Sequence, residues 1–264
     1  MSASTLPFSL KGKSILIAGG AGYLAAPVAA LAANLGANLC IADRDPDRLK
    51  TAATELGNRG FEGDIFGIDL DIGDENSINA CIDACAARFG YLDGFVNATF
   101  GSTGKRLEDL TSEDFDRANR VNLTGAFLMA RKVAEQMEQG GSILMYASMY
   151  GLVAPNPAAY PEGLNPNPIE YGAGKAGLAQ MVRYLAAHYG PRNVRVNAIA
   201  PGPFPNLNTT GWNKPFVKNL EQHTMLGRTG EQHETAGAAT FLLSPAASYI
   251  TGQVLSVDGG WTAW

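Results

Sequence analysis

Two residues spaced four apart could together carry out proton transfer. Tyr171 and Lys175 lie in a helical pattern, and this spacing places both side chains on one helix face, about 5–6 Å apart at Cβ. A free phenol, with a pKa near ~10, is a poor base at neutral pH. An ammonium about 4 Å away, at an effective dielectric constant of about 20, favours the phenolate by about 4 kcal/mol and so lowers that pKa by about three. The pair therefore predicts a tyrosine that acts as general acid or base near neutrality.

Two further polar residues complete the candidate catalytic set. Ser148 follows the apolar run 142–146, so its hydroxyl is expected at the carboxyl end of a strand, where ligands collect in open α/β sheets. There it could orient a substrate carbonyl and stabilise developing negative charge. Asn122 stands inside a helical segment, where an amide competes for backbone hydrogen bonds. We expect it to hold a water molecule beside Lys175 and to pass protons to solvent.

A glycine-rich turn near the N-terminus suits a dinucleotide. The first apolar run leads into Gly19-Gly20-Ala21-Gly22-Tyr23-Leu24-Ala25, where glycines let the backbone approach a pyrophosphate and the following helix points its N–H groups at the anion. The next strand ends at Asp43, whose carboxylate could accept hydrogen bonds from both adenosine-ribose hydroxyls and would repel a 2′-phosphate. NAD is therefore favoured over NADP. Arg44, the next residue, could instead bind that phosphate, so NADP stays open.

A third strand ends at Asp69-Leu70, where an apolar side chain could flank an adenine and a carboxylate could meet it. This residue pair extends the expected cofactor site beyond the glycine turn, which itself contributes Gly19, Gly22, Tyr23 and Leu24.

These residues need a scaffold, and apolar runs alternate with helical patterns along the whole chain. The expected strands are 14–18, 38–42, 64–68, 94–97, 142–146, 195–198 and 254–257; the expected helices are 22–35, 46–56, 75–89, 113–139, 169–189 and 231–243. Thr111 with Asp114 resembles a capping box, Gly36 and Gly90 stand where helices should stop, and Pro27 falls near a helix start. The alternation predicts a doubly wound parallel sheet of Rossmann type, with helices on both faces.

The chain of 264 residues is expected to form a single domain, 1–264, that both binds the dinucleotide and performs catalysis. Two irregular segments, 152–168 and 201–223, are predicted to be loops that border the substrate. Their amides, hydroxyls and aromatic rings suit a sugar, polyol or sugar acid, and the named candidates are Tyr160, Asn206 and Trp212. The same amides could instead merely turn the chain.

Composition excludes several classes of protein. The net charge of −5 argues against nucleic-acid binding through a basic surface. Three cysteines, Cys40, Cys81 and Cys85, argue against a disulfide framework and for a reducing compartment, and the last two are expected to be small buried helix residues.

The uncharged stretch 14–42 is broken by glycines, Pro27 and asparagines, so we expect no membrane span. A polar start at 1–13 shows no secretory signal, which indicates a cytoplasmic protein. The three histidines lack metal-ligand spacing, and no catalytic metal is expected.

The chain resembles the short-chain dehydrogenase/reductase family from about residue 10 to residue 264. The resemblance rests on the glycine turn and Asp43, and on four residues in the order and setting of that family: Asn122, Ser148, Tyr171 and Lys175. The resemblance implies an NAD(P)-dependent alcohol/carbonyl oxidoreductase, a homotetramer, and a Lys175 that binds the nicotinamide ribose. It also implies further cofactor contacts at Asn97, Ala98, Tyr171, Pro201, Gly202 and Phe204. The segments around 167–171 and 201–206 resemble family members linked to sugars and nucleotide sugars.

The chain departs from the family pattern in several places. The glycine turn has the spacing Gly19-x-x-Gly22-x-x-Ala25, which resembles the extended epimerase branch of the family. The usual Asn-Asn-Ala-Gly segment is replaced by Asn97-Ala98-Thr99-Phe100. About ten more residues than usual separate Ser148 from Tyr171. Phe100 is expected to shape the cofactor pocket. Two other functions therefore stay open: a sugar epimerase or dehydratase with tightly held NAD, and a non-catalytic dinucleotide-binding protein. A 3-oxoacyl thioester is the alternative substrate.

Overall fold

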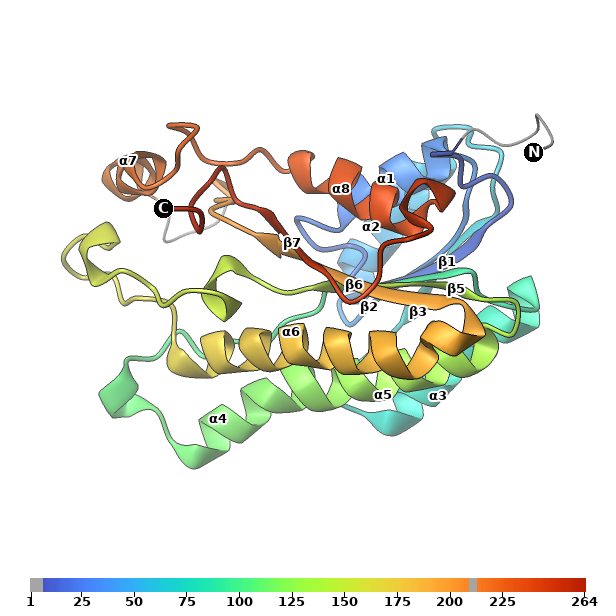
Figure 1. Cartoon of the computed structure of the whole chain (residues 1–264), viewed down its shortest axis with the longest axis horizontal. Helices are drawn as coiled ribbons and strands as arrows, with labels where there is room; N and C mark the ends of the chain where they lie inside the picture. The colour runs from blue at the N-terminus through green and yellow to red at the C-terminus, as the bar shows by residue number, and fades with distance from the viewer. Residues whose placement is uncertain (1–6, 209–212) are drawn as a thin grey trace.

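The computed structural model describes residues 7–208 and 213–264. Its centre is a seven-stranded parallel sheet with the order β3-β2-β1-β4-β5-β6-β7 (Figure 1). The strands are β1 Ser14–Ala18, β2 Asn38–Asp43, β3 Ile65–Asp69, β4 Gly94–Asn97, β5 Gly141–Tyr146, β6 Val194–Pro201 and β7 Val254–Val257. The expected fold class is confirmed. The chain runs outward from β1 to β3 and then returns to pair β4 with β1, so the strand order reverses between these two strands. In such sheets the crevice at this reversal receives ligands.

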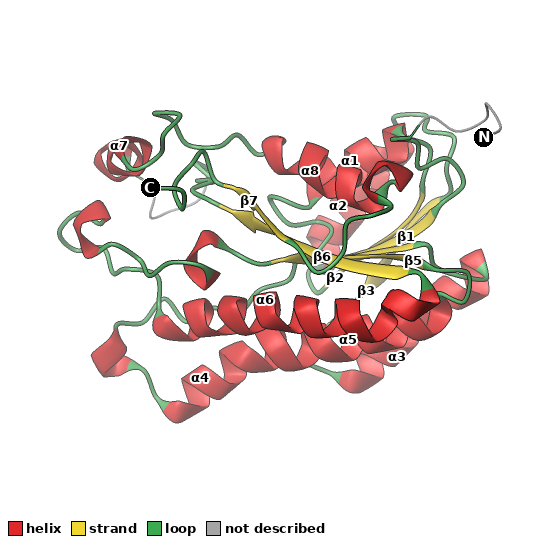
Figure 2. Cartoon of the chain, viewed as in Figure 1, coloured by secondary structure: helices red, strands yellow, loops and turns green. Residues whose placement is uncertain are grey.

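Helices cover both faces of the sheet. One face carries α1 Ala26–Asn34, α2 Pro46–Gly57 and α8 Glu234–Leu243, and the other carries α3 Glu75–Phe89, α5 Ala126–Gln136 and α6 Ile169–Tyr189 (Figure 2). Helix α4, Ser112–Asn119, precedes α5 on the second face, and α7, Lys214–Gln222, lies at one end of the molecule near the C-terminus. This two-layered coverage explains why the central strands are apolar throughout rather than alternating.

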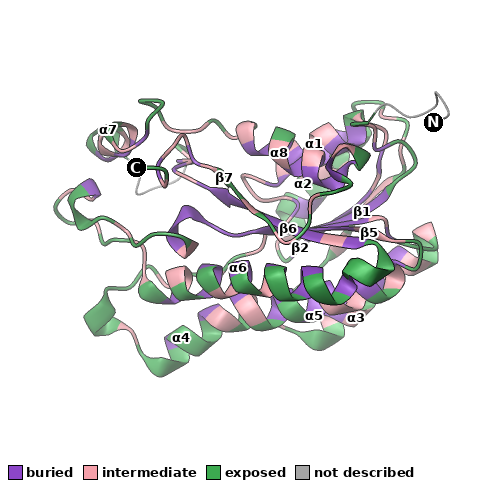
Figure 3. Cartoon of the chain, viewed as in Figure 1, coloured by how far each residue is buried: buried purple, intermediate pink, exposed green. Residues whose placement is uncertain are grey.

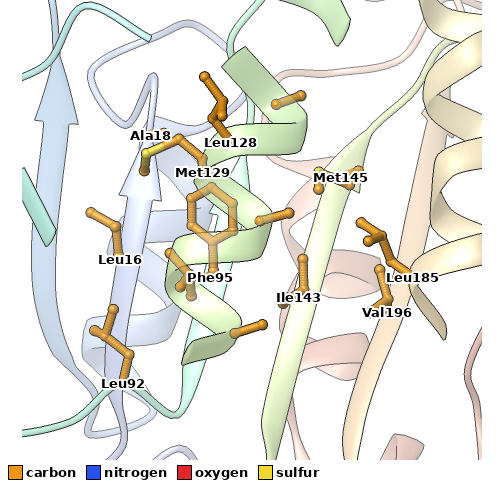
Figure 4. Close-up of a cluster of buried hydrophobic side chains, with 14 of the residues drawn as sticks. Leu16, Ala18, Leu92, Phe95, Leu128, Met129, Ile143, Met145, Leu185 and Val196 are labelled. Atoms are coloured by element: carbon orange, nitrogen blue, oxygen red, sulfur yellow. The ribbon is translucent and has the colours of Figure 1, made fainter. Parts of the chain in front are cut away.

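Each face of the sheet packs a core of its own. Strands β1, β4 and β5 are buried almost throughout (Figure 3). On the face of α5 and α6, one buried cluster contains Phe95, Met129, Ile143 and Val196, and Figure 4 shows these side chains on β4, α5, β5 and β6. The thiols of Cys40, Cys81 and Cys85 also lie in this core, fully buried, with their sulfur atoms within 4.8 Å of one another. The core thereby fixes the strand ends that carry the polar residues.

Local sequence signals explain where most helices begin and end. The capping box of α4 is present: the Thr111 side chain accepts from the Asp114 N–H, and the Asp114 side chain accepts in return from Thr111. Gly90 ends α3 with a φ of 80°. Helix α1 begins at Ala26 rather than at residue 22, because the Gly22 N–H turns back to the Gly19 carbonyl at 2.9 Å.

Two expected elements differ in the structure. The predicted helix 113–139 is divided by a π-helical segment, Arg120–Gly125, between α4 and α5. The prediction of a loop over 201–223 was wrong for α7, where Asn213 caps the helix by accepting from the Phe216 N–H, and Phe216 and Leu220 are buried one turn apart. Among the described residues, no helix is both long and apolar enough to cross a membrane.

Candidate active site

Tyr171 and Lys175 lie together in the first turns of α6. The Lys175 Nζ lies 5.7 Å from the centre of the Tyr171 ring, as their spacing predicts. This ammonium is buried and donates a hydrogen bond to the Tyr146 carbonyl at 2.7 Å, and a longer one of 3.4 Å to the Thr99 carbonyl. Strand β5 ends at Tyr146 and β4 ends just before Thr99, so the sheet itself places the partners of the lysine.

Both side chains have shifted pKa values. Burial lowers the pKa of Lys175 to about 7, because water no longer stabilises the ammonium. Burial raises the pKa of Tyr171, while an interaction with the Ser148 hydroxyl lowers it. The expected fall in the tyrosine pKa is therefore not seen. The cause is desolvation, which disfavours both charged forms and which the spacing of the two residues does not reveal.

Ser148 follows β5 in an extended conformation, with a φ of −165°. Its hydroxyl is buried and accepts the Tyr150 N–H at 3.1 Å, at the start of a 3₁₀ turn, Met149–Gly151. The interaction with Tyr171 places it beside the phenol. Serine, tyrosine and lysine thus meet at the carboxyl end of the sheet, as predicted.

Asn122 lies in the π-helical segment and is buried. Its side chain uses both of its polar atoms on one residue: Oδ1 accepts from the Gly101 N–H at 2.9 Å, and Nδ2 donates to the Gly101 carbonyl at 2.8 Å. These two bonds fix the orientation of the amide, and the water molecule expected beside Lys175 stays a prediction. It holds the loop that follows β4.

That loop begins with the cofactor candidates Asn97 and Ala98. The Asn97 Oδ1 accepts from both the N–H and the hydroxyl of Thr99, at 3.2 and 2.7 Å, so the threonine hydroxyl supports the turn. The ring of Phe100 is 65% exposed and meets the Tyr171 ring edge-on, with centroids 6.4 Å apart. Phe100 therefore forms a wall beside the phenol.

The glycine turn leaves bare backbone at the end of β1. Gly19 has a φ of +74°, and a Cβ added there would lie 3.1 Å from the Ala98 carbonyl carbon. A Cβ on Gly22 would lie 2.9 Å from the Gly19 oxygen. The turn thus excludes side chains and leads into the N-terminus of α1, which is the arrangement that a pyrophosphate needs. These residues fit a dinucleotide.

Asp43 ends β2 and is buried, with Oδ1 accepting from the Asp45 N–H at 3.2 Å and from Arg48 at 3.3 Å. Arg44 is exposed beside it. Asp69 is exposed at the end of β3, but the Leu70 side chain packs in the core on the face of α3. Leu70 is therefore not an open apolar wall for an adenine, since its position after the strand turns it inward.

The remaining cofactor candidates join the glycine turn to the segment after β6. The Tyr23 hydroxyl donates to the Pro205 carbonyl at 3.2 Å. The Leu24 carbonyl accepts from the Tyr146 hydroxyl at 3.4 Å. Pro201 ends β6, the Gly202 N–H donates to the Val257 carbonyl at 3.0 Å, and Phe204 packs on Gly230, where a Cβ would lie 2.3 Å from its ring.

The expected substrate side brings together segments that are far apart in the sequence. The hydroxyls of Tyr150 and Tyr160 are 2.7 Å apart, and the Tyr160 ring packs against Phe216 of α7 with centroids at 5.2 Å. Burial raises the pKa of both phenols, so they stay neutral hydrogen-bonding groups. Tyr150 was missed from the sequence, although its position two residues after Ser148 was a signal. Asn206 accepts from the Asn208 N–H, and Trp212 lies outside the described residues.

Comparisons with known proteins agree with this geometry. A family model described as enoyl-(acyl carrier protein) reductase matches residues 21–262. The chain is 34% identical to a D-threitol dehydrogenase of Mycolicibacterium smegmatis, covering 97% of this chain and 95% of the relative. It is 33% identical to a 7alpha-hydroxysteroid dehydrogenase of Escherichia coli, covering 95% and 94%. A short-chain dehydrogenase/reductase from Mycobacterium marinum has a structure that superposes with a TM-score of 0.87, at 28% identity and 98% coverage of both chains. The chain belongs to the short-chain dehydrogenase/reductase family of oxidoreductases.

Proposed function

We propose that this protein is an NAD(P)-dependent enzyme that interconverts a secondary alcohol and a ketone. The observation that carries the proposal is the meeting of Tyr171, Lys175 and Ser148 at the carboxyl ends of β4 and β5, beside a glycine turn with bare backbone. Acid–base groups next to a dinucleotide crevice suit hydride transfer coupled to proton transfer.

In this mechanism Tyr171 removes the hydroxyl proton of the alcohol, or returns it to the ketone oxygen. Ser148 donates a hydrogen bond to the same oxygen and stabilises its negative charge. Lys175 holds the nicotinamide ribose and favours the phenolate when its amine is protonated. The bound nicotinamide supplies the acceptor or donor of the hydride. Asn122 supports the site by holding the loop after β4.

NAD is the proposed cofactor, and NADP is the alternative. Asp43 supports NAD because it is a buried carboxylate at the end of β2, where it would accept ribose hydroxyls and repel a 2′-phosphate. Arg44 and Arg48 lie beside it and keep the alternative open.

A sugar, polyol or sugar acid is the proposed substrate. The paired hydroxyls of Tyr150 and Tyr160 and the amide of Asn206 offer hydrogen bonds on the substrate side, and Trp212 remains a sequence-based candidate there. The D-threitol dehydrogenase relative acts on a polyol by its name, which supports this class. A 3-oxoacyl thioester is the alternative, supported by the name of the matching family model.

The test is a screen of polyols, sugars, sugar acids and 3-oxoacyl thioesters with NAD and NADP in parallel, followed by NADH absorbance. A net change in absorbance supports a dehydrogenase. An epimerase or dehydratase would convert the substrate with no net change, and a non-catalytic binding protein would bind NAD without conversion.

The Tyr171→Phe variant is the control that assigns the chemistry. It removes the acid–base hydroxyl and is expected to lower kcat by about 10²- to 10⁴-fold. Its affinity for NADH, measured by fluorescence, should stay close to that of the native protein. Retained turnover would refute the proposed role.

We also propose a cytoplasmic homotetramer. Three free, buried thiols suit a reducing compartment. Subunit contacts are supported by exposed aromatic rings on α4, α5 and α6, namely Phe115, Phe127 and Tyr184. Trp264 near the C-terminus is 74% exposed and also suits such a contact. Light scattering coupled to size exclusion tests the tetramer, and a clean monomer would overturn it.

A further inference from the structure

The loop after β4 is held at every second residue by a side chain from elsewhere in the site. Asn97 binds Thr99, Asn122 binds Gly101, and both the N–H and the hydroxyl of Thr103 donate to one oxygen of Glu170, at 2.9 and 2.8 Å. The first two side chains belong to the expected site. Glu170 does not, although it directly precedes Tyr171 in α6.

Glu170 is fully buried, with 0% of its surface exposed. Its Oε1 accepts the two hydrogen bonds from Thr103, whereas its Oε2 is one of two buried side-chain atoms without a hydrogen-bond partner among the described residues; the other is the Asn119 Oδ1. Burying a carboxyl group with an open acceptor costs free energy. Two features offset that cost: the donors of Thr103, and the positive end of a 21-residue helix in which Glu170 is the second residue.

The tethered loop touches both members of the acid–base pair. Its Thr99 carbonyl accepts from the Lys175 Nζ, and its Phe100 ring lies edge-on against Tyr171. Glu170 therefore connects the start of the helix that carries Tyr171 and Lys175 to the loop that contacts both of them.

We propose that Glu170 is a positioning residue for proton transfer: its bonds to Thr103 hold the loop so that Thr99 and Phe100 fix Lys175 and Tyr171. This inference rests on the proposed function. The hydrogen bonds of the Glu170 side chain go to Thr103 and not to Tyr171 or Lys175, so Glu170 acts through the loop.

The first test needs no turnover. Hydrogen exchange followed by mass spectrometry compares the native protein with Glu170→Ala, Glu170→Gln and Glu138→Ala. Glu138 is an exposed glutamate three residues before β5, at the amino ends of the strands and so opposite the site. Exchange at residues 99–103 is expected to rise in Glu170→Ala only, because the amide oxygen of glutamine can still accept from Thr103. Unchanged exchange in Glu170→Ala would overturn the tether. Thr103→Val, which loses the hydroxyl but keeps the N–H, gives a milder variant should alanine unfold the protein.

The second test concerns catalysis. Glu170→Ala is expected to lower kcat by about 10- to 100-fold, since small displacements of acid–base groups are costly. Inhibition by ADP, which would report the glycine turn at the start of the loop, should change much less than kcat, and Glu170→Gln should restore most of kcat. Native kinetics in Glu170→Ala despite faster exchange would show a purely structural tether and overturn the proposal. If no variant and no native protein turns over any substrate, the proposed function has failed, whereas the exchange data still decide the tether.

Discussion

The ammonium of Lys175 shares a buried site with the phenol of Tyr171, and burial is the main cause of both pKa shifts. Because the lysine pKa is about 7, the amine is partly neutral at physiological pH. A ligand that offers acceptors to this amine would favour its charged form, and a charged amine in turn favours the phenolate. In the proposed function, dinucleotide binding at Lys175 would thereby be coupled to proton transfer by Tyr171.

The buried lysine gives a stability prediction with a defined sign. Below about pH 7 the lysine is charged in both the folded and the unfolded chain; between about pH 7 and its ordinary pKa of 10.5, only the unfolded chain keeps the proton. The free energy of unfolding of the native protein should therefore rise with pH in this range, relative to Lys175→Met. Urea unfolding at pH 6.5, 8 and 9.5 measures this difference, and Tyr171 does not interfere because its pKa is raised above 10. Parallel pH curves for the two proteins would contradict the prediction.

Asp43 gives a prediction about cofactor choice. Asp43→Asn removes the charge that repels a 2′-phosphate and frees Arg48, now 3.3 Å from Oδ1, to reach that phosphate. The ratio of kcat/KM for NADP to that for NAD is expected to rise by about tenfold or more. Asp47→Asn, the same charge change at an exposed position of α2, is the matched control and should leave the ratio unchanged.

At the residue scale, the sequence predicted which groups meet but not how they are solvated. The four-residue spacing of Tyr171 and Lys175 and the strand before Ser148 were sufficient to bring the three together. The pKa shifts depend on burial by segments far away in the chain, and the partner of Asn122 is 21 residues distant. The role of Leu70 was misjudged and Glu170 was missed for the same reason, because tertiary packing decides which side chains of a strand end or a helix are buried.

The π-helical segment between α4 and α5 is the least regular element of the site. It contains Asn122 and ends at Gly125, which packs so closely on the loop after β3 that an added Cβ would lie 2.2 Å from the Ile72 carbonyl oxygen. The segment therefore sets the rotation of α4 relative to α5 and aims Asn122 at the loop after β4.

Replacing Gly125 tests this packing. Gly125→Ala is expected to destabilise the protein by at least about 1–3 kcal/mol, because the overpacked methyl meets backbone atoms. Gly237→Ala in α8, where nothing lies within 4 Å of the added Cβ, should instead stabilise by up to about 1 kcal/mol. Urea unfolding compares the two variants, and equal effects would contradict this account.

Elements with strong patterns were predicted well. Strands β1, β4 and β7 and helices α3 and α6 have the expected bounds. The π-helical segment was not foreseen, since its cause is a contact with Ile72 across the fold. Helix α7 was missed because prolines and asparagines around it resemble a loop, although Asn213 is a good helix cap.

At the scale of the whole molecule, the parallel sheet places the carboxyl ends of all its strands on one side and their amino ends on the other. The carboxyl ends carry Ser148, the glycine turn and Asp43, whereas the core below them is apolar. The alternation of strands and helices, with the rule of right-handed crossovers, was enough to predict this architecture. The register and the pairing of Tyr150 with Tyr160 were not predictable, since they depend on how distant segments pack.

The reactivity of the three cysteine thiols measures whether the core stays closed. Cys40, Cys81 and Cys85 have no exposed surface, so a thiol reagent such as dithionitrobenzoate should label none of them rapidly in the native protein and all three after unfolding in urea. Rapid labelling of the native chain would show that α3 separates readily from β2.

The position of Trp261 has a consequence for the order of assembly. It is buried with Tyr150 and Phe216, and its ring stacks on His223 at 5.3 Å, so the chain's last segment closes the wall on the substrate side. During synthesis on the ribosome the glycine turn and Asp43, which lie in the first half of the chain, emerge early. The wall that Trp261 completes must wait for the final residues to emerge, so a chain truncated before Trp261 would contain the proposed cofactor residues yet lack a closed place for the second reactant.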